Sequence, residues 1–383
     1  MKILISAGDY SADLHGESLV RELRARAPDL SVTALGGGRL RGVADEFLRD
    51  MVRMDISGFS QPFKQFFSLK SILQKMIFPR LASREFDAVI LIDYYGFNIH
   101  IARKARAFGI PVFYFVSPQV WASRGWRIQE LKRAVTKMLV IFPFEEELYR
   151  GHGVPAEFVG HPAVDAVERA ESGRPAGAER DRPAAPGDGV LKLGILPGSR
   201  HRELARHLPI MLKALELLRK RFPKIEATVF AVDWIPDEDY LAALEGRPVR
   251  LSREQDLRER AGLDFCLTAS GTAALEIALL RIPQVVIYQA SWLTYWVARL
   301  LIRVDYISMP NILSGKMIVP ELIQGEASPA RVAEEAEKIL SDPLRLESAR
   351  SELIELRKSL GKPGAYSRAA DVVLDSLRNP VRP

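Results

Sequence analysis

Short apolar runs alternate with longer amphipathic patterns along almost the whole chain, and this alternation restricts the fold more than any other feature. Runs of this kind, bounded by polar residues, glycine or proline, are typical of buried parallel strands joined by crossover helices. The expected strands are Lys2–Ala7, Ser31–Leu35, Phe86–Ile92, Val112–Val116, Lys137–Phe142, Leu191–Leu196, Glu226–Val232, Asp264–Thr268 and Gln284–Tyr288. The clearest expected helices are Leu14–Arg26, Arg202–Arg221 and Thr272–Leu280. The pattern predicts an α/β protein with two doubly wound, Rossmann-like sheets.

The segment 168–189 interrupts this alternation. It reads ERAESGRPAGAERDRPAAPGDG, is rich in proline, glycine, alanine and charge, and has no apolar periodicity. It therefore predicts a linker or a surface loop. The 383 residues of the chain suit two domains, and we expect an N-terminal domain over 1–167 and a second domain over 190–340. Beyond Pro329 the pattern predicts mostly amphipathic helix.

Composition limits the compartment and the partners. No apolar run approaches the roughly 20 residues that a membrane-spanning helix needs, and Asp9 and Asp13 interrupt the N-terminus where a secretory signal would continue. These features predict a cytosolic protein. Cys266 is the single cysteine, so we expect no disulfide and no cysteine-based metal site within one chain. The net charge of +6 favours an anionic partner: nucleic acid, a phosphorylated metabolite or an anionic membrane surface.

One candidate phosphate-binding loop, 196–200, lies between a predicted strand and a predicted helix. Gly198 allows a tight turn, Ser199 can cap the helix, and the backbone N–H groups at a helix start suit a phosphate. Arg200 would add a forked donor, and Glu203 would orient Arg200 or act as an acidic first-turn residue. An ordinary turn with a surface arginine explains the same residues equally well.

A second turn of small residues follows the strand that ends near Thr268. Ser270, Gly271 and Thr272 allow close approach of a diphosphate at the helix start, and Glu276 is placed to accept hydrogen bonds from ribose hydroxyls. The alternative is a tightly packed helix start with a solvated glutamate. Two such turns in one domain favour nucleotide binding by the second half of the chain.

The first half offers a candidate base. The loop after the first strand contains Asp9 and Ser11, with Ser11 or Asp13 as a candidate helix N-cap. Its spacing is not the G-x-G-x-x-G fingerprint, which argues against a dehydrogenase. Asp93 directly follows another strand, and an acid at the carboxyl end of a strand is a candidate general base for a sugar hydroxyl. A loop or helix cap is the alternative role for Asp93.

Three further residues follow apolar segments of this half. Ser117 and Trp121 come after one predicted strand, and Trp121 is a candidate sugar contact, although tryptophan is more often part of a core. His161 is similarly placed, although a lone histidine is more often structural. No pair of histidines or carboxylates has metal-ligand spacing, so we expect metal-independent chemistry without a cofactor.

The segment 56–78 is unusually aromatic and basic. It contains Phe59, Phe63, Phe66 and Phe67 with interleaved lysines. Such a segment lies in a bilayer interface or lines a groove for acyl chains; a core-facing helix is an equally good interpretation. Base stacking ranks last, because no nucleic-acid-binding motif is present, and we expect no nucleic-acid partner.

Several motifs, in order along the chain, resemble the lipid-A-disaccharide synthase family. They are 196–200 with Glu203, the SGTAALE segment 270–276, the DYISMPNILSGK segment 305–316, the VSPQVWA segment 116–122, the FPFE segment 142–145 and Gly160-His161. Together they span roughly 2–324, and the collinear set is far more specific than any single motif.

The resemblance implies a GT-B fold, in which two Rossmann-like domains face a cleft and helices over 341–383 pack back on the first domain. It also implies transfer of 2,3-diacylglucosamine from its UDP derivative to 2,3-diacylglucosamine 1-phosphate, giving a β(1→6) disaccharide phosphate and UDP. Asp93 matches the family's proposed base, and Arg200, Glu276 and Asn311 match positions tied to the UDP-sugar. The phenylalanine-rich segment matches the region thought to meet the membrane, which implies peripheral association with the cytoplasmic face of the inner membrane.

The chain departs from the family pattern after Asp93, where Tyr94-Tyr95-Gly96 lacks the usual proline and second acid. The departure bears on the acceptor site, whose candidates are Asp9, Ser11, Asn98, Ser117, Trp121 and His161. Other interpretations are a GT-B enzyme with a different lipid acceptor, a UDP-sugar epimerase, or a non-catalytic UDP-sugar-binding paralogue. A homodimer is compatible with each of them.

Overall fold

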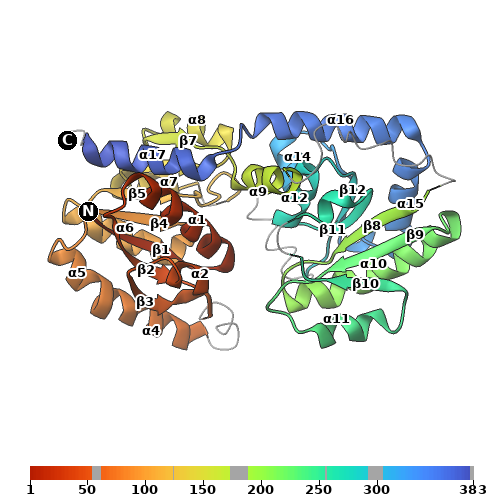
Figure 1. Ribbon diagram of the computed structural model, residues 1–383, viewed down its shortest axis with the longest axis horizontal. Coiled ribbons are helices and arrows are strands. Elements are labelled where there is room, and N and C mark those ends of the chain that lie inside the picture. The colour runs from red at the N-terminus through yellow and green to blue at the C-terminus, as the bar shows by residue number, and fades with distance from the viewer. Residues whose placement is uncertain (54–61, 124, 173–188, 255–256, 292–304, 380–383) are drawn as a thin grey trace. The chain divides into compact units, whose positions relative to one another are not determined.

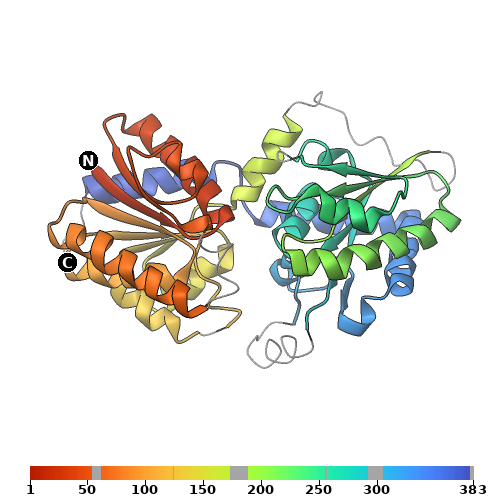
Figure 2. The same cartoon turned by 90° about the horizontal axis from the view of Figure 1, so that it is seen from below.

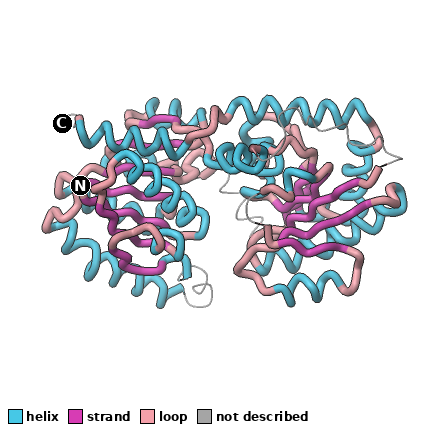
Figure 3. Tube along the Cα trace, viewed as in Figure 1, coloured by secondary structure: helices cyan, strands magenta, loops and turns pink. Residues whose placement is uncertain are grey.

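The chain forms two compact units, each with its own parallel sheet. The computed structural model describes residues 1–53, 62–123, 125–172, 189–254, 257–291 and 305–379 (Figure 1). The first unit comprises Met1–Pro162 and Lys362–Pro383, and the second comprises Ala163–Gly361. In each unit the described strands form a central sheet with helices packed around it (Figure 3), as the alternating sequence pattern predicts.

The sheet of the first unit has seven strands in the order β3-β2-β1-β4-β5-β6-β7. The strands are β1 Lys2–Ala7, β2 Ser31–Gly36, β3 Glu46–Asp50, β4 Ala88–Ile92, β5 Val112–Phe115, β6 Lys137–Val140 and β7 Ala156–Phe158. The strand order reverses between β1 and β4, which are hydrogen-bonded neighbours with Ala7 opposite Ile92. Ligands of doubly wound sheets bind beyond the carboxyl ends of the strands at such a switch point.

Helices pack on both faces of this sheet. They are α1 Tyr10–Arg26, α2 Gly38–Arg41, α4 Pro62–Ile72, α5 Phe78–Ala82, α6 Tyr95–Ala107, α7 Arg127–Ala134, α8 Pro143–Gly151 and α17 Ala365–Arg378, with a π-helical turn at Leu73–Ile77. One apolar core joins the strands to α6, α7 and the segment around α5. On the other side, α17 lies against α1 (Figure 1, Figure 2), and Arg26 of α1 donates to Asp371 at 2.5 Å.

The sheet of the second unit has six strands in the order β10-β9-β8-β11-β12-β13. They are β8 Leu191–Leu196, β9 Ile225–Phe230, β10 Val249–Ser252, β11 Phe265–Ala269, β12 Gln284–Tyr288 and β13 Glu321–Ile323. Its helices are α9 Pro162–Glu171, which begins at the last residue of the first unit, α10 His201–Arg221, α11 Asp237–Leu244, α12 Thr272–Leu279, α14 Met309–Ser314, α15 Pro329–Leu340 and α16 Pro343–Ser359. The switch point lies between β8 and β11, where Leu196 pairs with Thr268.

The unit boundaries differ from the expected 167 and 341. Helix α9 extends into the segment expected to be a linker, whose residues 173–188 lie outside the described structure. Helix α16 packs on α12, α14 and α15, so it belongs to the second unit, and only α17 returns to the first. Ion pairs also hold α16 in the second unit. Arg357 of α16 binds Glu171 at 2.7 Å and Glu168 at 3.1 Å, and both glutamates belong to α9.

The chain crosses between the units twice, and Arg368 of α17 joins the two crossings within the first unit. Its guanidinium donates to the carbonyl oxygen of Val159 at 2.8 Å, of Lys362 at 2.7 Å and of Pro363 at 2.8 Å. A Cβ on Gly160 would lie 2.3 Å from this guanidinium, so the neighbouring position must be glycine. The segment leaving the first unit and the segment re-entering it are therefore held by one side chain.

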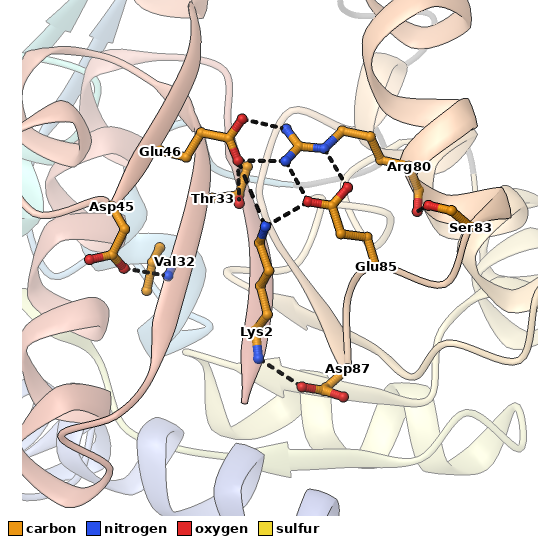
Figure 4. A network of polar contacts seen from close by, with 9 residues as sticks. All are labelled: Lys2, Val32, Thr33, Asp45, Glu46, Arg80, Ser83, Glu85 and Asp87. Atoms are coloured by element: carbon orange, nitrogen blue, oxygen red, sulfur yellow. Dashed lines mark hydrogen bonds and ion pairs between the residues drawn. The ribbon is translucent and has the colours of Figure 1, made fainter.

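An ion-pair network lies at the amino ends of the strands of the first sheet, at the end opposite the switch-point loops (Figure 4). Arg80 of α5 binds Glu46 of β3 and Glu85, and Lys2 of β1 binds Glu85 at 2.6 Å and donates its backbone N–H to Asp87 at 2.7 Å. Hydrogen bonds from Arg80 lower the pKa of Glu85 to about 2. The network has a structural role, because it lies at the end of the sheet away from the switch-point loops.

Candidate functional site

Two acidic residues meet at the switch point of the first sheet. Asp9 follows β1 and Asp93 follows β4, and the register of the two strands places their loops side by side. Burial, with a smaller contribution from the negative charge of Asp9, raises the pKa of the Asp93 carboxyl to about 6. A half-buried carboxyl with a pKa near neutrality, at the carboxyl edge of a sheet, is suited to take a proton from a substrate hydroxyl.

The backbone at Asp93 is strained. Asp93 and Tyr94 both have left-handed conformations, with φ of 44° and 48°, and Val116 after the neighbouring β5 has φ of 56°. Left-handed residues other than glycine cost of order 1–3 kcal/mol each and concentrate at functional sites. The Asp93 carbonyl is held by the Asn98 amide at 2.8 Å and the Tyr114 hydroxyl at 2.6 Å. These contacts fix the strained turn that orients the Asp93 carboxyl.

Asn98 is therefore a positioning residue. It is fully buried; its side-chain oxygen accepts from the Ser6 hydroxyl at 2.7 Å, and its amide donates to the carbonyls of Ile92 and Asp93. Ser6 belongs to β1 and Ile92 to β4, so Asn98 joins the two strands at the switch point. Asn98 is among the residues expected to contact the acceptor, but its side-chain oxygen and its amide N–H groups have partners within the protein.

The residue that caps α1 is not one of the two expected residues, Ser11 and Asp13. The N-cap of α1 is Asp9, whose carboxylate accepts from the Ala12 N–H and from the Ser11 hydroxyl at 2.8 Å each. Neither Ser11 nor Asp13 is the cap, because Asp13 instead binds the N–H groups of Gly37, Arg39 and Leu40 at the start of α2. The Ser11 side chain is exposed and remains available to a ligand.

Tyr94, at the point where the chain departs from the family pattern, packs directly on Gly8. A Cβ on Gly8 would lie 2.0 Å from the Tyr94 ring, so only glycine fits beneath it. Gly96, where the family pattern has an acid, is exposed, and a Cβ there would have no neighbour within 4 Å. Position 96 is therefore an open, exposed position at the start of α6.

Ser117 and Trp121 converge on Glu145, which belongs to the motif at 142–145 but is not among the expected site residues. Glu145 of α8 is 1% exposed and accepts from the Ser117 hydroxyl at 2.6 Å and the Trp121 indole N–H at 3.1 Å. Its other oxygen accepts from the Phe142 N–H at 3.3 Å. Burial raises the pKa of Glu145 to about 7. The signal in the sequence was an acid three residues after the end of an apolar run, in the position of a helix capping box.

His161 lies in the interior of the first unit. It is 7% exposed and lies against Phe142, with ring centroids 5.1 Å apart. Burial, with a smaller effect of the nearby His15, lowers the pKa of His161 to about 3. The His15 imidazole in turn contacts the Tyr366 hydroxyl of α17 at 2.9 Å. His161 is therefore neutral at physiological pH and can serve only as an uncharged hydrogen-bonding group.

The two turns of small residues lie together at the switch point of the second sheet. Gly198 has a φ of 112°, and a Cβ there would lie 2.6 Å from the Glu203 carboxylate, so the turn requires glycine. Glu203 accepts from the Ser199 N–H at 2.9 Å and from Arg200 at 3.3 Å. The expected Ser199 cap is not formed, because Arg200 is the N-cap residue of α10 and no side chain caps it. The Arg200 side chain is 73% exposed, so its guanidinium is accessible to an anion from solution while it contacts Glu203.

The second turn presents backbone rather than side chains. Gly271 and Thr272 are exposed at the start of α12, and a Cβ on Gly271 would meet nothing within 4 Å. The Ser270 hydroxyl donates to the Ile307 carbonyl at 2.8 Å, which ties this turn to the segment 305–316. Glu276 forms an ion pair with Arg260 at 2.9 Å, and its side chain is 24% exposed. Burial raises the pKa of Glu276.

Asn311 joins the segment 305–316 to the residues that follow it. It is fully buried, donates to the Glu321 carboxylate at 2.7 Å and the Val319 carbonyl at 2.8 Å, and accepts from the N–H groups of Ile318 and Val319. Glu321 also accepts from the Ser308 hydroxyl at 2.6 Å. Asn311 uses all of its hydrogen-bonding capacity within the protein, so in this structure it holds the 305–316 segment instead of presenting its amide to a ligand.

The aromatic segment divides between core and surface. Ile72, Leu73 and Ile77 are buried in the first unit, whereas Phe67 of α4 is 66% exposed. Phe59 and the side chains of Phe63 and Phe66 lie outside the described residues. Within the described part of the chain, no helix is both long and apolar enough to cross a membrane. The same residues contain no group of three or more His, Cys, Asp or Glu side chains arranged to hold a metal ion.

Two doubly wound sheets with polar loops at both switch points define the two-domain GT-B class. The chain has this fold in common with two solved structures, over nearly the full length of each. A UDP-N-acetylglucosamine 2-epimerase from Neisseria meningitidis bound to UDP-GlcNAc has a TM-score of 0.63 at 13% identity, covering 99% of this chain and 100% of that one. A putative UDP-N-acetylglucosamine 2-epimerase from Listeria monocytogenes has a TM-score of 0.66 at 13% identity, covering 100% and 98%. At this identity the likeness concerns the fold alone.

The sequence comparison identifies the family. The family model described as lipid-A-disaccharide synthetase matches residues 3–375, and the chain belongs to this family. The protein named lipid-A-disaccharide synthase from Myxococcus xanthus is 39% identical over 378 residues, 98% of this chain and 97% of that protein. The resemblance carried by the short motifs is thereby confirmed.

Proposed function

We propose that this chain transfers 2,3-diacylglucosamine from UDP-2,3-diacylglucosamine to 2,3-diacylglucosamine 1-phosphate, forming the β(1→6) disaccharide phosphate and UDP. The observation that carries the proposal is Asp93: a half-buried carboxyl on a strained turn at a switch point, with a pKa raised to about 6, in a chain of this family. An acid so placed serves as a general base at neutral pH, because its charged form dominates there while its basicity exceeds that of an ordinary aspartate.

The reaction is a single inverting displacement. The 6-hydroxyl oxygen of the acceptor forms a bond to the anomeric carbon of the donor as the bond from that carbon to the UDP phosphate oxygen breaks. Asp93 takes the hydroxyl proton, and UDP leaves with the electron pair of the broken bond. Because attack and departure occur on opposite faces, an α-linked donor gives a β-linked product.

The donor is assigned to the second unit. Arg200 and the backbone N–H groups of the exposed residues Gly271 and Thr272 would bind the diphosphate and stabilise the charge on the leaving UDP. Glu276 would accept the ribose hydroxyls. Glu203 would hold Arg200 in place, and we expect this charge stabilisation to need no metal.

The acceptor is assigned to the first unit, where Ser11 is exposed and Ser117 and Trp121 are held by Glu145. Both substrates carry acyl chains, so the chain must meet them at a lipid surface. The exposed Phe67 supports peripheral contact with the cytoplasmic face of the inner membrane through the aromatic segment.

The test is a turnover assay with the purified chain in detergent, with both substrates supplied and UDP and disaccharide followed by mass. Formation of both products in the presence of a chelator would support donor, acceptor and metal independence together. Release of UDP with free 2,3-diacylglucosamine in place of disaccharide would mean transfer to water and would refute the acceptor. Binding of UDP without any turnover would refute the enzymatic assignment.

A further inference from the structure

A pocket of about 650 Å³ lies between α6 and α7 on the first unit. Helix α6 contributes Arg103 and Arg106, and the start and body of α7 contribute Trp126, Glu130 and Arg133. Tyr95, the first residue of α6, lies beside Asp93, whereas Arg103 and Arg106 lie about two and three turns further along the helix. Neither Asp9 nor Asp93 lines the pocket, so it is separate from the switch-point site.

The pocket has an excess of positive charge. Three arginines against one glutamate leave a net charge of +2. Glu130 is already engaged, because it pairs with Arg103 and accepts from the Tyr95 hydroxyl. Arg106 and Arg133 are exposed. Neither forms an ion pair with another residue of the described ranges, so the pocket lining contains two exposed guanidinium groups without a counter-charge. Paired guanidinium groups match the oxygen geometry of a phosphate.

An exposed tryptophan lies at the edge of these cations. Trp126 is 65% exposed, and the Arg127 guanidinium lies 5.8 Å from its ring centre and 4.1 Å from that of Tyr95. A solvent-exposed indole beside arginines is typical of a protein surface at the headgroup level of a bilayer. A site for a free phosphate compound has no need of an exposed indole in its lining.

The helices next to the pocket form one layer that combines exposed aromatic side chains with positive charge. The π-helical turn after α4 and helix α5 pack on α6, and α6 packs on α7, so these helices form one layer. This layer carries the exposed Phe67 on α4 as well as Trp126 before α7. Two large exposed aromatic side chains on one layer, with a basic pocket between α6 and α7, fit a lipid surface that bears negative charge.

We propose that the pocket between α6 and α7 binds the phosphate of an anionic phospholipid headgroup, with Arg106 and Arg133 as its donors and Trp126 inserted beside it. The proposal rests on the membrane contact proposed above, but not on the transfer reaction. It adds a defined headgroup site, made from helices that the aromatic segment does not include.

The experiment is vesicle co-sedimentation of the full chain, with vesicles of phosphatidylcholine alone and of phosphatidylcholine mixed with phosphatidylglycerol. The double variant Arg106→Ala/Arg133→Ala should bind the mixed vesicles about 25-fold more weakly, because each cation at an anionic surface contributes about fivefold. The matched control is Lys213→Ala/Lys220→Ala, which removes two exposed cations from α10 of the second unit. Both pairs lower the net charge from +6 to +4 (6 − 2 = 4), so only a local site distinguishes them. Trp126→Phe should abolish a blue shift of tryptophan fluorescence on binding.

Equal losses in the two double variants would overturn the headgroup site in favour of overall charge. Equal binding of the parent chain to neutral and mixed vesicles would also overturn it. Inorganic phosphate at millimolar concentration should not displace the chain from mixed vesicles; displacement would mean that the pocket takes a free phosphate compound. Turnover in detergent should be unchanged in the arginine variant. If the parent chain shows no turnover but the arginines still govern vesicle binding, the proposed reaction fails and the headgroup site stands.

Discussion

Asp9 lies close enough to Asp93 for its negative charge to raise the pKa of the Asp93 carboxyl, and the two residues come from strands that are neighbours at the switch point. Asp9 also caps α1 through the Ala12 N–H. One residue thus has two effects, because it fixes the first helix and makes Asp93 a stronger base than an isolated aspartate.

Replacement of the candidate base tests its role directly. Asp93→Asn should lower the turnover rate by about 10²–10⁴-fold, the contribution of a positioned base, with UDP affinity unchanged. Turnover by mass and UDP titration by calorimetry are the measurements. The matched control is Asp87→Asn, at the other end of β4, where the carboxylate binds the Lys2 N–H. An unaltered rate in Asp93→Asn would remove the residue from this role.

The pH dependence of kcat/KM should follow the titration of the Asp93 carboxyl. Because its pKa is raised to about 6 and the charged form is the base, kcat/KM should fall as the pH decreases through about 6. Asp9→Asn removes the neighbouring negative charge but keeps a good N-cap, so it should move this limb to lower pH. If the acidic decline of kcat/KM in Asp9→Asn stays at the same pH or moves to higher pH, the charge of Asp9 does not raise the pKa of Asp93.

The exposed Arg200 should act on affinity and not on stability. Arg200→Ala should weaken UDP binding by about tenfold to a hundredfold, the range for hydrogen bonds to a charged group, without changing the urea midpoint. Arg206→Ala, another exposed arginine on α10, is the control and should bind UDP as the parent chain does. Equal affinities of the Arg200 and Arg206 variants would refute this placement of the diphosphate.

Replacement of Asn311 should lower stability, whereas replacement of Arg200 should lower UDP affinity. Asn311→Ala leaves the N–H groups of Ile318 and Val319 and part of the Glu321 carboxylate unpaired. Since each unsatisfied buried group costs about 1–3 kcal/mol, the free energy of unfolding should fall by about 3 kcal/mol or more. Urea unfolding and UDP titration of the same samples provide the measurements. Lost affinity at full stability would make Asn311 a direct ligand.

Glu145 predicts a pH-dependent stability. Its pKa is raised to about 7 in the folded chain from an ordinary value near 4.5. Protonation therefore favours the folded state, so this contribution is complete below the ordinary value and is lost as the pH rises through about 7. Glu145→Gln should flatten this decline in urea unfolding curves. Glu145→Ala should cost about 1–3 kcal/mol and shift Trp121 fluorescence, because the Ser117 and Trp121 donors lose their acceptor. A decline that persists unchanged in Glu145→Gln would assign it to another group.

The central strands could be predicted because their burial leaves a continuous apolar run. All five residues of β4 are buried, and β1, β8 and β12 begin and end as expected. The strands β3, β7, β10 and β13 at the sheet edges were missed. They are three to five residues long, and charged or polar side chains interrupt them, as in Glu46–Asp50 and Val249–Ser252. An edge strand has no second neighbour to bury it, so its sequence carries little apolar signal.

The site could be predicted where chemistry depends on position along a strand, and not where it depends on partners far apart in sequence. Asp93 and the turn at Gly198 follow strands directly, which the sequence displays. The burial of Asn98, the ion pair of Glu276 with Arg260 and the convergence of Ser117 and Trp121 on Glu145 all join different loops. No local pattern records such pairings, which is also why Ser11 and Asp13 were preferred to Asp9 as the cap of α1.

The contacts of Arg368 make the second unit an insertion within the first. One guanidinium binds carbonyl groups on both sides of the inserted segment, at Val159 and at Lys362 and Pro363, so residues 163–361 begin and end at neighbouring points. A segment with adjacent ends can be exchanged between relatives as a single cassette, with two junctions that keep Gly160 and Arg368. The proposed donor-binding half of the chain is then free to be replaced while the fold of the other half, including its C-terminal helix, stays intact.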